Sequence, residues 1–125
     1  MLPHDPTQPA RHLHVVPDRP ASPRFGFVVH AQDDVLTVTP TGELDLDTVP
    51  VLEAAMGYQR ELGFGALVVD LSDLTFIDSS GVHLLLRWAH GAAEGQHDFR
   101  VIPGTERVQR VLAVTGVLGA LGLDG

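Results

Sequence analysis

The chain has 125 residues, enough for one domain or for one domain with a tail. It contains no cysteine, which excludes disulfides, thiolate nucleophiles and cysteine-ligated zinc. Its formal net charge is −8 and its only fixed cations are arginines, so the composition argues against binding to nucleic acid or to anionic membranes. The sequence shows neither a signal peptide nor an apolar run of transmembrane length, and we therefore expect a soluble cytoplasmic protein.

The first 24 residues differ in composition from the rest. They hold prolines at positions 3, 6, 9, 17, 20 and 23 and show little apolar periodicity. This pattern predicts a disordered tail over residues 1–24 and one folded domain over residues 25–125. His4, His12 and His14 lie in the tail, but nothing in the pattern arranges them as ligands, and we expect no metal site there.

Two strands and a helix are predicted next. Apolar residues alternate over 25–30 and again over 35–39, and residues 31–34 between them are typical of a hairpin turn. Asp47 or Thr48 is suited to cap a helix that tolerates Pro50 in its first turn. Gly63 or Gly65 is suited to end that helix. Its inner face is predicted to comprise Leu52, Ala55, Met56, Gln59 and Leu62.

A third strand is predicted over residues 66–71, whose continuous apolar run indicates a central position or a parallel neighbour. A short apolar run over 74–77, a strand or a loop, leads to a second helix over residues 80–90. The core face of that helix is predicted to comprise Val82, Leu85, Leu86 and Ala89. Leu84 and Trp88 form a second apolar stripe, which is either buried as well or exposed for a partner.

The last predicted elements are a loop over 91–95, a strand over 99–102 and a third helix. Thr105 is suited to cap this helix and Gly116 to end it, with Val108, Val111 and Leu112 facing inward. The segment after Gly116 is compatible with a short strand, a helical turn or a frayed end. The order of elements predicts an α/β fold, with a mixed sheet of about four to five strands and helices packed mainly on one face.

The segment Asp78-Ser79-Ser80-Gly81 is the strongest candidate for a functional site. It places a carboxylate and two hydroxyls where the second helix begins, and the first backbone N–H groups of a helix have no partner within the helix. A capping hydroxyl suits this place, and so does an added phosphate, so Ser79 is either a helix N-cap or a phosphate acceptor.

An enzymatic role is not expected. The serine-hydrolase motif G-x-S-x-G is replaced here by I-D-S-S-G, and His83 on the same helix brings no orienting acid with it. Asp70 ends a strand in the manner of a receiver-domain phosphate acceptor, but that chemistry requires a lysine, which this chain lacks. We expect Asp45, Asp70, Asp73 and Asp78 to line turns at one end of the sheet and to hold no metal. No cofactor is expected.

Three segments together resemble a known family. They are TGELDLDTVPVLEAAM at 41–56, LVVDLSDLTFIDSSGVHLLL at 67–86 and FRVIPGTERVQRVLAVTGV at 99–117. The chain resembles the STAS domain in its stand-alone bacterial form, the anti-sigma factor antagonist. The resemblance covers Phe25 to about Val117 and implies a mixed sheet with helices on one face.

The resemblance also implies a mechanism. A Ser-kinase anti-sigma factor would bind the unphosphorylated chain, freeing its sigma factor, and would then be released by phosphorylating Ser79. A phosphatase would reset the switch. The implied partner-binding residues are Glu43, Asp45, Asp78, Ser79, Ser80 and Gly81. The alternative is a STAS scaffold without a switch, as a subunit of a sensory or lipid-transport complex. The sequence leaves a weak homodimer open.

Overall fold

The computed structural model describes residues 12–13, 24–95 and 97–123, and within them the chain forms one mixed sheet of six strands. The strands are β1 (His12–Leu13), β2 (Phe25–Gln32), β3 (Val35–Leu44), β4 (Ala66–Asp70), β5 (Leu74–Ile77) and β6 (Asp98–Ile102). The helices are α1 (Val49–Glu61), α2 (Ser79–Ala93) and α3 (Glu106–Val114).

Strand β3 organises the sheet. It pairs with β2 in an antiparallel hairpin, and on its other side its first half runs parallel to β4 and its second half parallel to β5. Strand β6 extends the sheet parallel to β4, and β1 lies outside β2. A β-bulge between Gly42 and Glu43 marks the point where β5 takes over from β4 as the neighbour of β3.

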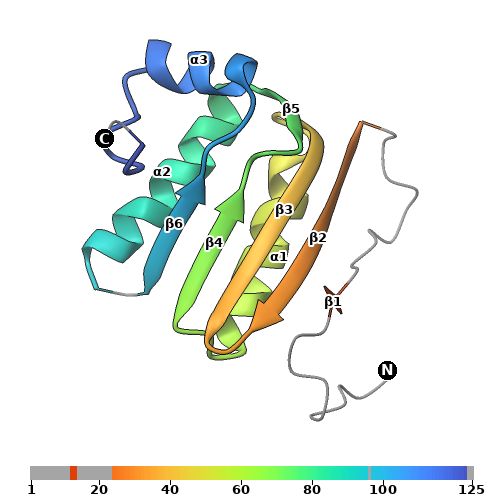
Figure 1. Ribbon diagram of the computed structural model, residues 1–125, viewed down its shortest axis with the longest axis vertical. Coiled ribbons are helices and arrows are strands. Elements are labelled where there is room, and N and C mark those ends of the chain that lie inside the picture. The colour runs from red at the N-terminus through yellow and green to blue at the C-terminus, as the bar shows by residue number, and fades with distance from the viewer. Residues whose placement is uncertain (1–11, 14–23, 96, 124–125) are drawn as a thin grey trace.

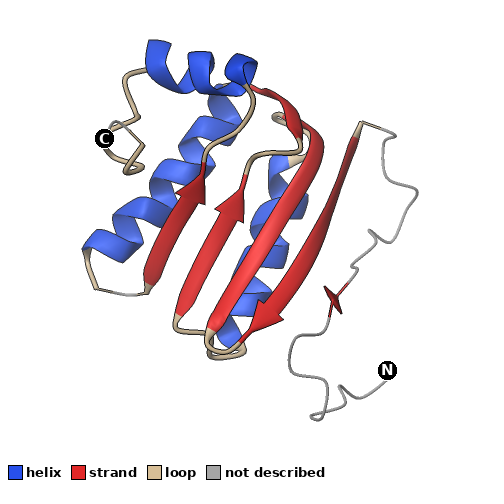
Figure 2. Cartoon of the chain, viewed as in Figure 1, coloured by secondary structure: helices blue, strands red, loops and turns tan. Residues whose placement is uncertain are grey.

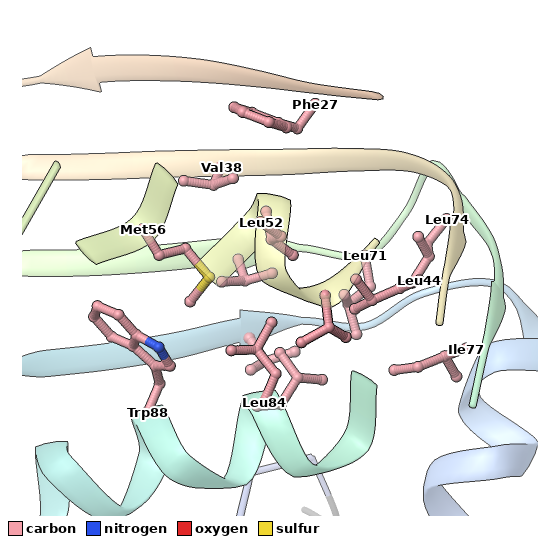
Figure 3. Packing of buried hydrophobic residues seen from close by; sticks show 14 of the residues in the cluster. Phe27, Val38, Leu44, Leu52, Met56, Leu71, Leu74, Ile77, Leu84 and Trp88 are labelled. Carbon is pink, nitrogen blue, oxygen red and sulfur yellow. The ribbon is translucent and has the colours of Figure 1, made fainter. Parts of the chain in front are cut away.

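Helices α1 and α2 lie along the same face of the sheet, and α3 lies across one end of it (Figures 1 and 2). This confirms the predicted α/β fold with helices mainly on one face. The core lies between the sheet and the two long helices. Leu52 and Met56 of α1 and Leu84 of α2 are fully buried there, facing sheet residues such as Val38 (Figure 3). Leu85 of α2 is fully buried as well.

The second apolar stripe of α2 is buried. Leu84 is 0% exposed and Trp88 is 8% exposed, so these side chains belong to the core and not to a partner surface. The Trp88 ring centroid lies 5.1 Å from that of His97 and 6.4 Å from that of Phe99. The Arg60 guanidinium lies 5.7 Å from the Trp88 ring centroid.

Residues 74–77, for which the sequence left a strand or a loop open, form a strand. Several element boundaries differ from the prediction. Helix α2 continues to Ala93 because Gly91, predicted to begin a loop, is buried within the helix. Leu62, predicted to face the core, follows the last residue of α1 and is 55% exposed. After Gly116 the chain forms turns, in which Val117 and Leu121 are buried.

The prediction for residues 1–24 falls almost entirely outside the described residues, which there comprise only β1 and Arg24. Gln59, predicted for the inner face of α1, has a side chain outside the described set as well. Within the described ranges, no helix is both long enough and apolar enough to cross a membrane.

Candidate functional site

The carboxyl ends of β3 and β5 bring two of the predicted acidic residues together. Asp45 follows β3 and Asp78 follows β5, directly after the paired residues Leu44 and Ile77. Asp70 ends β4, which pairs with β3 only as far as Val38, so Asp70 lies further back along the sheet. Each carboxylate stabilises its own turn. Asp70 Oδ1, for example, accepts a hydrogen bond of 2.9 Å from the backbone N–H of Ser72. In the described part of the chain, no group of three or more His, Asp or Glu side chains is arranged to hold a metal ion.

Asp78, and not Ser79, is the N-cap of α2. Its Oδ1 accepts hydrogen bonds from the backbone N–H groups of Ser80 at 2.8 Å and Gly81 at 3.2 Å. Ser79 is the first helical residue and is exposed, and among the described residues its hydroxyl has no hydrogen-bond partner. The N-cap interpretation of Ser79 is therefore wrong. The sequence could not decide this, because aspartate and serine are equally good N-caps.

A second turn lies beside this cap, at the entry to α1. Asp45 Oδ1 accepts hydrogen bonds from the backbone N–H groups of Asp47 at 3.0 Å and Thr48 at 3.1 Å. The buried Thr48 hydroxyl accepts one from the Asp45 N–H at 2.8 Å and donates one to the Glu43 carbonyl oxygen at 2.8 Å. These reciprocal bonds hold the turn and leave Leu46 at its outside, 72% exposed.

The two turns are fixed to each other. The Asp78 backbone N–H donates to the Leu44 carbonyl oxygen at 3.1 Å, immediately before Asp45. Gly81 is buried beneath them, and a Cβ atom there would lie 2.7 Å from Ile77 Cγ1 and 3.0 Å from Leu44 Cδ2. Gly81 was predicted among the partner-binding residues, but its place is beneath the surface, where it permits close packing.

Glu43 lies on the β3 side of the site and is held by Arg24, whose Nη1 is 2.6 Å from Glu43 Oε1. Phe76 of β5 is the register partner of Glu43 and is 38% exposed. Sequence reasoning missed two exposed apolar residues here, Leu46 and Phe76. Leu46 could have been identified from its position between Asp45 and Asp47 in a predicted turn. We define the Ser79 corner as Glu43, Asp45, Leu46, Phe76, Asp78, Ser79 and Ser80.

The corner has the features of a recognition surface and lacks those of a hydrolytic centre. Two apolar side chains lie among several carboxylates, and the Ser79 hydroxyl makes no hydrogen bond to a base within the described residues. His83 is exposed on α2 and makes no bond to Ser79. Catalysis by Ser79 would require a base within hydrogen-bond reach and donors for an oxyanion. The geometry suits modification of the hydroxyl by another protein and docking of that protein.

Comparison with known proteins identifies the class. The family model described as "Mlab, STAS domain" matches residues 27–123, and the chain belongs to this STAS family. The model spans every described element from β3 to α3 and includes the whole Ser79 corner. The fold and the family resemblance predicted from the sequence are thereby confirmed.

Three proteins that are similar to this chain are all named as antagonists of an anti-sigma factor. The anti-sigma-B factor antagonist of Staphylococcus epidermidis is 29% identical over 85 residues, which are 68% of this chain and 79% of that protein. The crystal structure of an anti-sigma factor antagonist from Mycobacterium paratuberculosis has a TM-score of 0.66 and 28% identity, covering 81% of this chain and 86% of that one. The anti-sigma factor antagonist SpoIIAA in its unphosphorylated form shares the fold, with a TM-score of 0.63, 21% identity and coverage of 74% and 82%.

Proposed function

We propose that this chain is a cytoplasmic anti-sigma factor antagonist switched by phosphorylation of Ser79. While Ser79 is unphosphorylated, the Ser79 corner binds a Ser-kinase anti-sigma factor and keeps it from its sigma factor. Phosphorylation of Ser79 by that kinase dissociates the complex, and a phosphatase restores the form of the chain that binds. The names of the relatives support the antagonist function, and none of the three names describes an enzyme.

The observation that carries this proposal is the exposed and uncommitted hydroxyl of Ser79. Asp78 already caps α2, so modification of Ser79 breaks no hydrogen bond of the described structure. A phosphate adds a charge of about −1.5 to −2 at neutral pH. The positive end of the α2 dipole favours that charge, so the fold should survive phosphorylation.

The same charge opposes binding of a partner. It is added beside Asp78 and Asp45, on a surface that a docked protein would remove from water, and an uncompensated buried charge is costly. Converting a 99:1 preference for the bound state into 1:99 requires about 5.5 kcal/mol of differential affinity. The free-energy cost of burying a doubly charged phosphate among carboxylates is of that magnitude.

The decisive experiment uses the recombinant kinase-type anti-sigma factors of the source organism, mixed one at a time with the chain and ATP. We expect one of them to phosphorylate the unmodified chain and the Ser80→Ala variant but not the Ser79→Ala variant. That kinase should bind Ser79→Ala and fail to bind Ser79→Asp. Ser80→Ala is the matched control because its hydroxyl lies one residue away. Phosphate on Ser80, or equal binding to Ser79→Asp, would contradict the switch.

A second candidate function is a STAS scaffold without a switch, and the description of the matching family model, which names Mlab, favours keeping it. In that case Asp78 caps α2 for structural reasons alone and Ser79 is an ordinary first-turn residue. The partners of a scaffold would be retained equally by the unmodified chain and by Ser79→Asp. Affinity capture with both baits therefore separates the two functions.

A further inference from the structure

The outward face of α1 is unusual for a surface helix. Such a face is normally charged or polar, whereas here the exposed residues Pro50, Ala54 and Tyr58 follow one another at four-residue intervals. Leu46 before the helix and Leu62 after it continue the spacing. The three largest side chains of this set are well exposed, Leu46 by 72%, Tyr58 by 62% and Leu62 by 55%. We call Leu46, Pro50, Ala54, Tyr58 and Leu62 the α1 stripe.

The α1 stripe begins inside the Ser79 corner. Leu46 belongs to both surfaces, because it lies in the turn that Asp45 and Thr48 hold beside the α2 cap. A standard protein interface engages about 20–30 residues on each side. The Ser79 corner alone is much smaller, so a stable complex must cover a neighbouring surface as well. Along α2 the exposed neighbours are polar, among them His83, Arg87 and His90, whereas α1 presents the apolar Pro50, Ala54 and Tyr58 beside the charged Arg60 and Glu61.

The charges around the α1 stripe indicate what kind of partner surface would bind to it. Its two ends are bordered by the exposed acids Asp47 and Glu61. On the side toward α2, Glu53 is paired with Arg87 at 2.9 Å and Arg60 lies over the Trp88 ring. An apolar surface bordered by acids fits a partner whose apolar residues are bordered by arginines or lysines.

A second copy of this chain fits less well. Antiparallel pairing of two stripes about Ala54 would place Asp47 of one copy against Glu61 of the other. Each copy also carries a net charge of −8. Like charges brought together at an interface are unfavourable, so the charge pattern favours a basic partner over self-association.

We infer that the α1 stripe is the second half of the surface that the anti-sigma factor occupies, with an apolar, basic-bordered face of that protein lying along α1. This inference rests on the proposed function. It assigns the two halves different tasks: the Ser79 corner makes binding depend on phosphorylation, and the α1 stripe supplies apolar contact that phosphorylation does not alter. Tyr58 is the central anchor, since large aromatic residues dominate interface energetics.

The test measures dissociation constants for the kinase-type anti-sigma factor that phosphorylates the chain. Tyr58→Gln keeps a good helix former and removes the aromatic ring, and we expect it to weaken binding by about tenfold or more. Glu61→Lys should weaken binding and slow association, because it opposes the basic border of the partner. The matched control is Val35→Thr. It replaces an exposed apolar residue with a polar residue that also favours strands. Val35 lies at the β2–β3 hairpin, far from the Ser79 corner.

Comparison with Ser79→Asp separates the two proposals. Tyr58→Gln should weaken the binding of the unmodified chain without abolishing it, whereas Ser79→Asp alone should abolish binding. If Tyr58→Gln binds like Val35→Thr while Ser79→Asp abolishes binding, the α1 inference is overturned and the proposed function stands. If sedimentation shows a dimer that Tyr58→Gln dissociates, the occupant is a second copy and the inference is likewise overturned. If no kinase binds the unmodified chain, the proposed function fails and the inference fails with it.

Discussion

The backbone N–H of Asp78 donates a hydrogen bond of 3.1 Å to the carbonyl oxygen of Leu44. This bond joins the turn that starts α2 to the turn that starts α1, although the two residues lie far apart in the sequence. It ties the capping carboxylate of Asp78 to the strand that leads directly into Asp45. The Ser79 corner is therefore one surface in which side-chain bonds hold each turn and a backbone bond joins the two turns.

Substitution of Ser79 should leave the stability of the domain almost unchanged. Its hydroxyl is exposed and makes no hydrogen bond within the described residues, so Ser79→Ala should alter the free energy of unfolding by less than about 0.5 kcal/mol. In Ser79→Asp the α2 dipole favours the new charge while Asp78 repels it, and the net change should stay within about 1 kcal/mol. Urea denaturation measures both. A much larger loss in Ser79→Ala would mean that the hydroxyl has a structural role.

Substitution of Asp78 should have a clear cost. Asp78→Ala removes the acceptor for two backbone N–H groups at the start of α2, and loss of an N-cap costs about 1 kcal/mol. Asp78→Asn is the matched control, because its amide oxygen can accept the same bonds, and it should retain most of the stability. Thermal and urea unfolding of the two variants test this. Equal destabilisation by alanine and asparagine would show that the negative charge, and not the cap, is what stabilises the helix.

Much of the fold follows from local sequence patterns. Alternating apolar residues in β2 and β3, the capping position of Thr105 and the terminating positions of Gly63 and Gly116 are all observed as predicted. Thr105 accepts a hydrogen bond from the Val108 N–H at 3.3 Å, and both glycines have positive φ. In these cases a short-range physical rule decides the structure, and no distant residue overrides it.

The remaining features depend on tertiary contacts. The four residues of β5 show no strand alternation, and they become a strand because β3 offers them an edge beyond the bulge at Gly42. Gly91 ends no helix because it is packed in the core, and Gly95, with φ 81°, follows the end of α2 instead. The exposed Leu46 and Phe76 were not identified because local patterns do not reveal which apolar residues the helices leave uncovered.

The two helical glycines at positions 57 and 81 should respond in opposite directions to alanine. At Gly81 an added Cβ would lie 2.7 Å from Ile77 Cγ1 and 3.0 Å from Leu44 Cδ2, so the start of α2 must shift, at a cost of about 1–3 kcal/mol. At Gly57 in α1 nothing lies within 4 Å of the added atom, and alanine should stabilise the helix by about 0.5–1 kcal/mol. Urea unfolding of both variants measures the contrast. Stabilisation by Gly81→Ala would contradict the close packing beneath the Ser79 corner.

His97 should be replaceable by phenylalanine with a gain in stability. Both of its ring nitrogens are buried and, within the described part of the chain, neither has a hydrogen-bond partner, while its ring lies against Trp88 and Phe99. A buried polar group without a partner costs about 1–3 kcal/mol, and a phenyl ring avoids that cost in a similar shape. We expect His97→Phe to raise the free energy of unfolding by about 1 kcal/mol, allowing for some repacking. The matched control is His90→Phe, because the His90 side chain is 80% exposed and its replacement should change stability by less than about 0.5 kcal/mol. Thermal unfolding of the two variants decides the matter, and destabilisation by His97→Phe would show that the imidazole makes a bond that the structure does not contain.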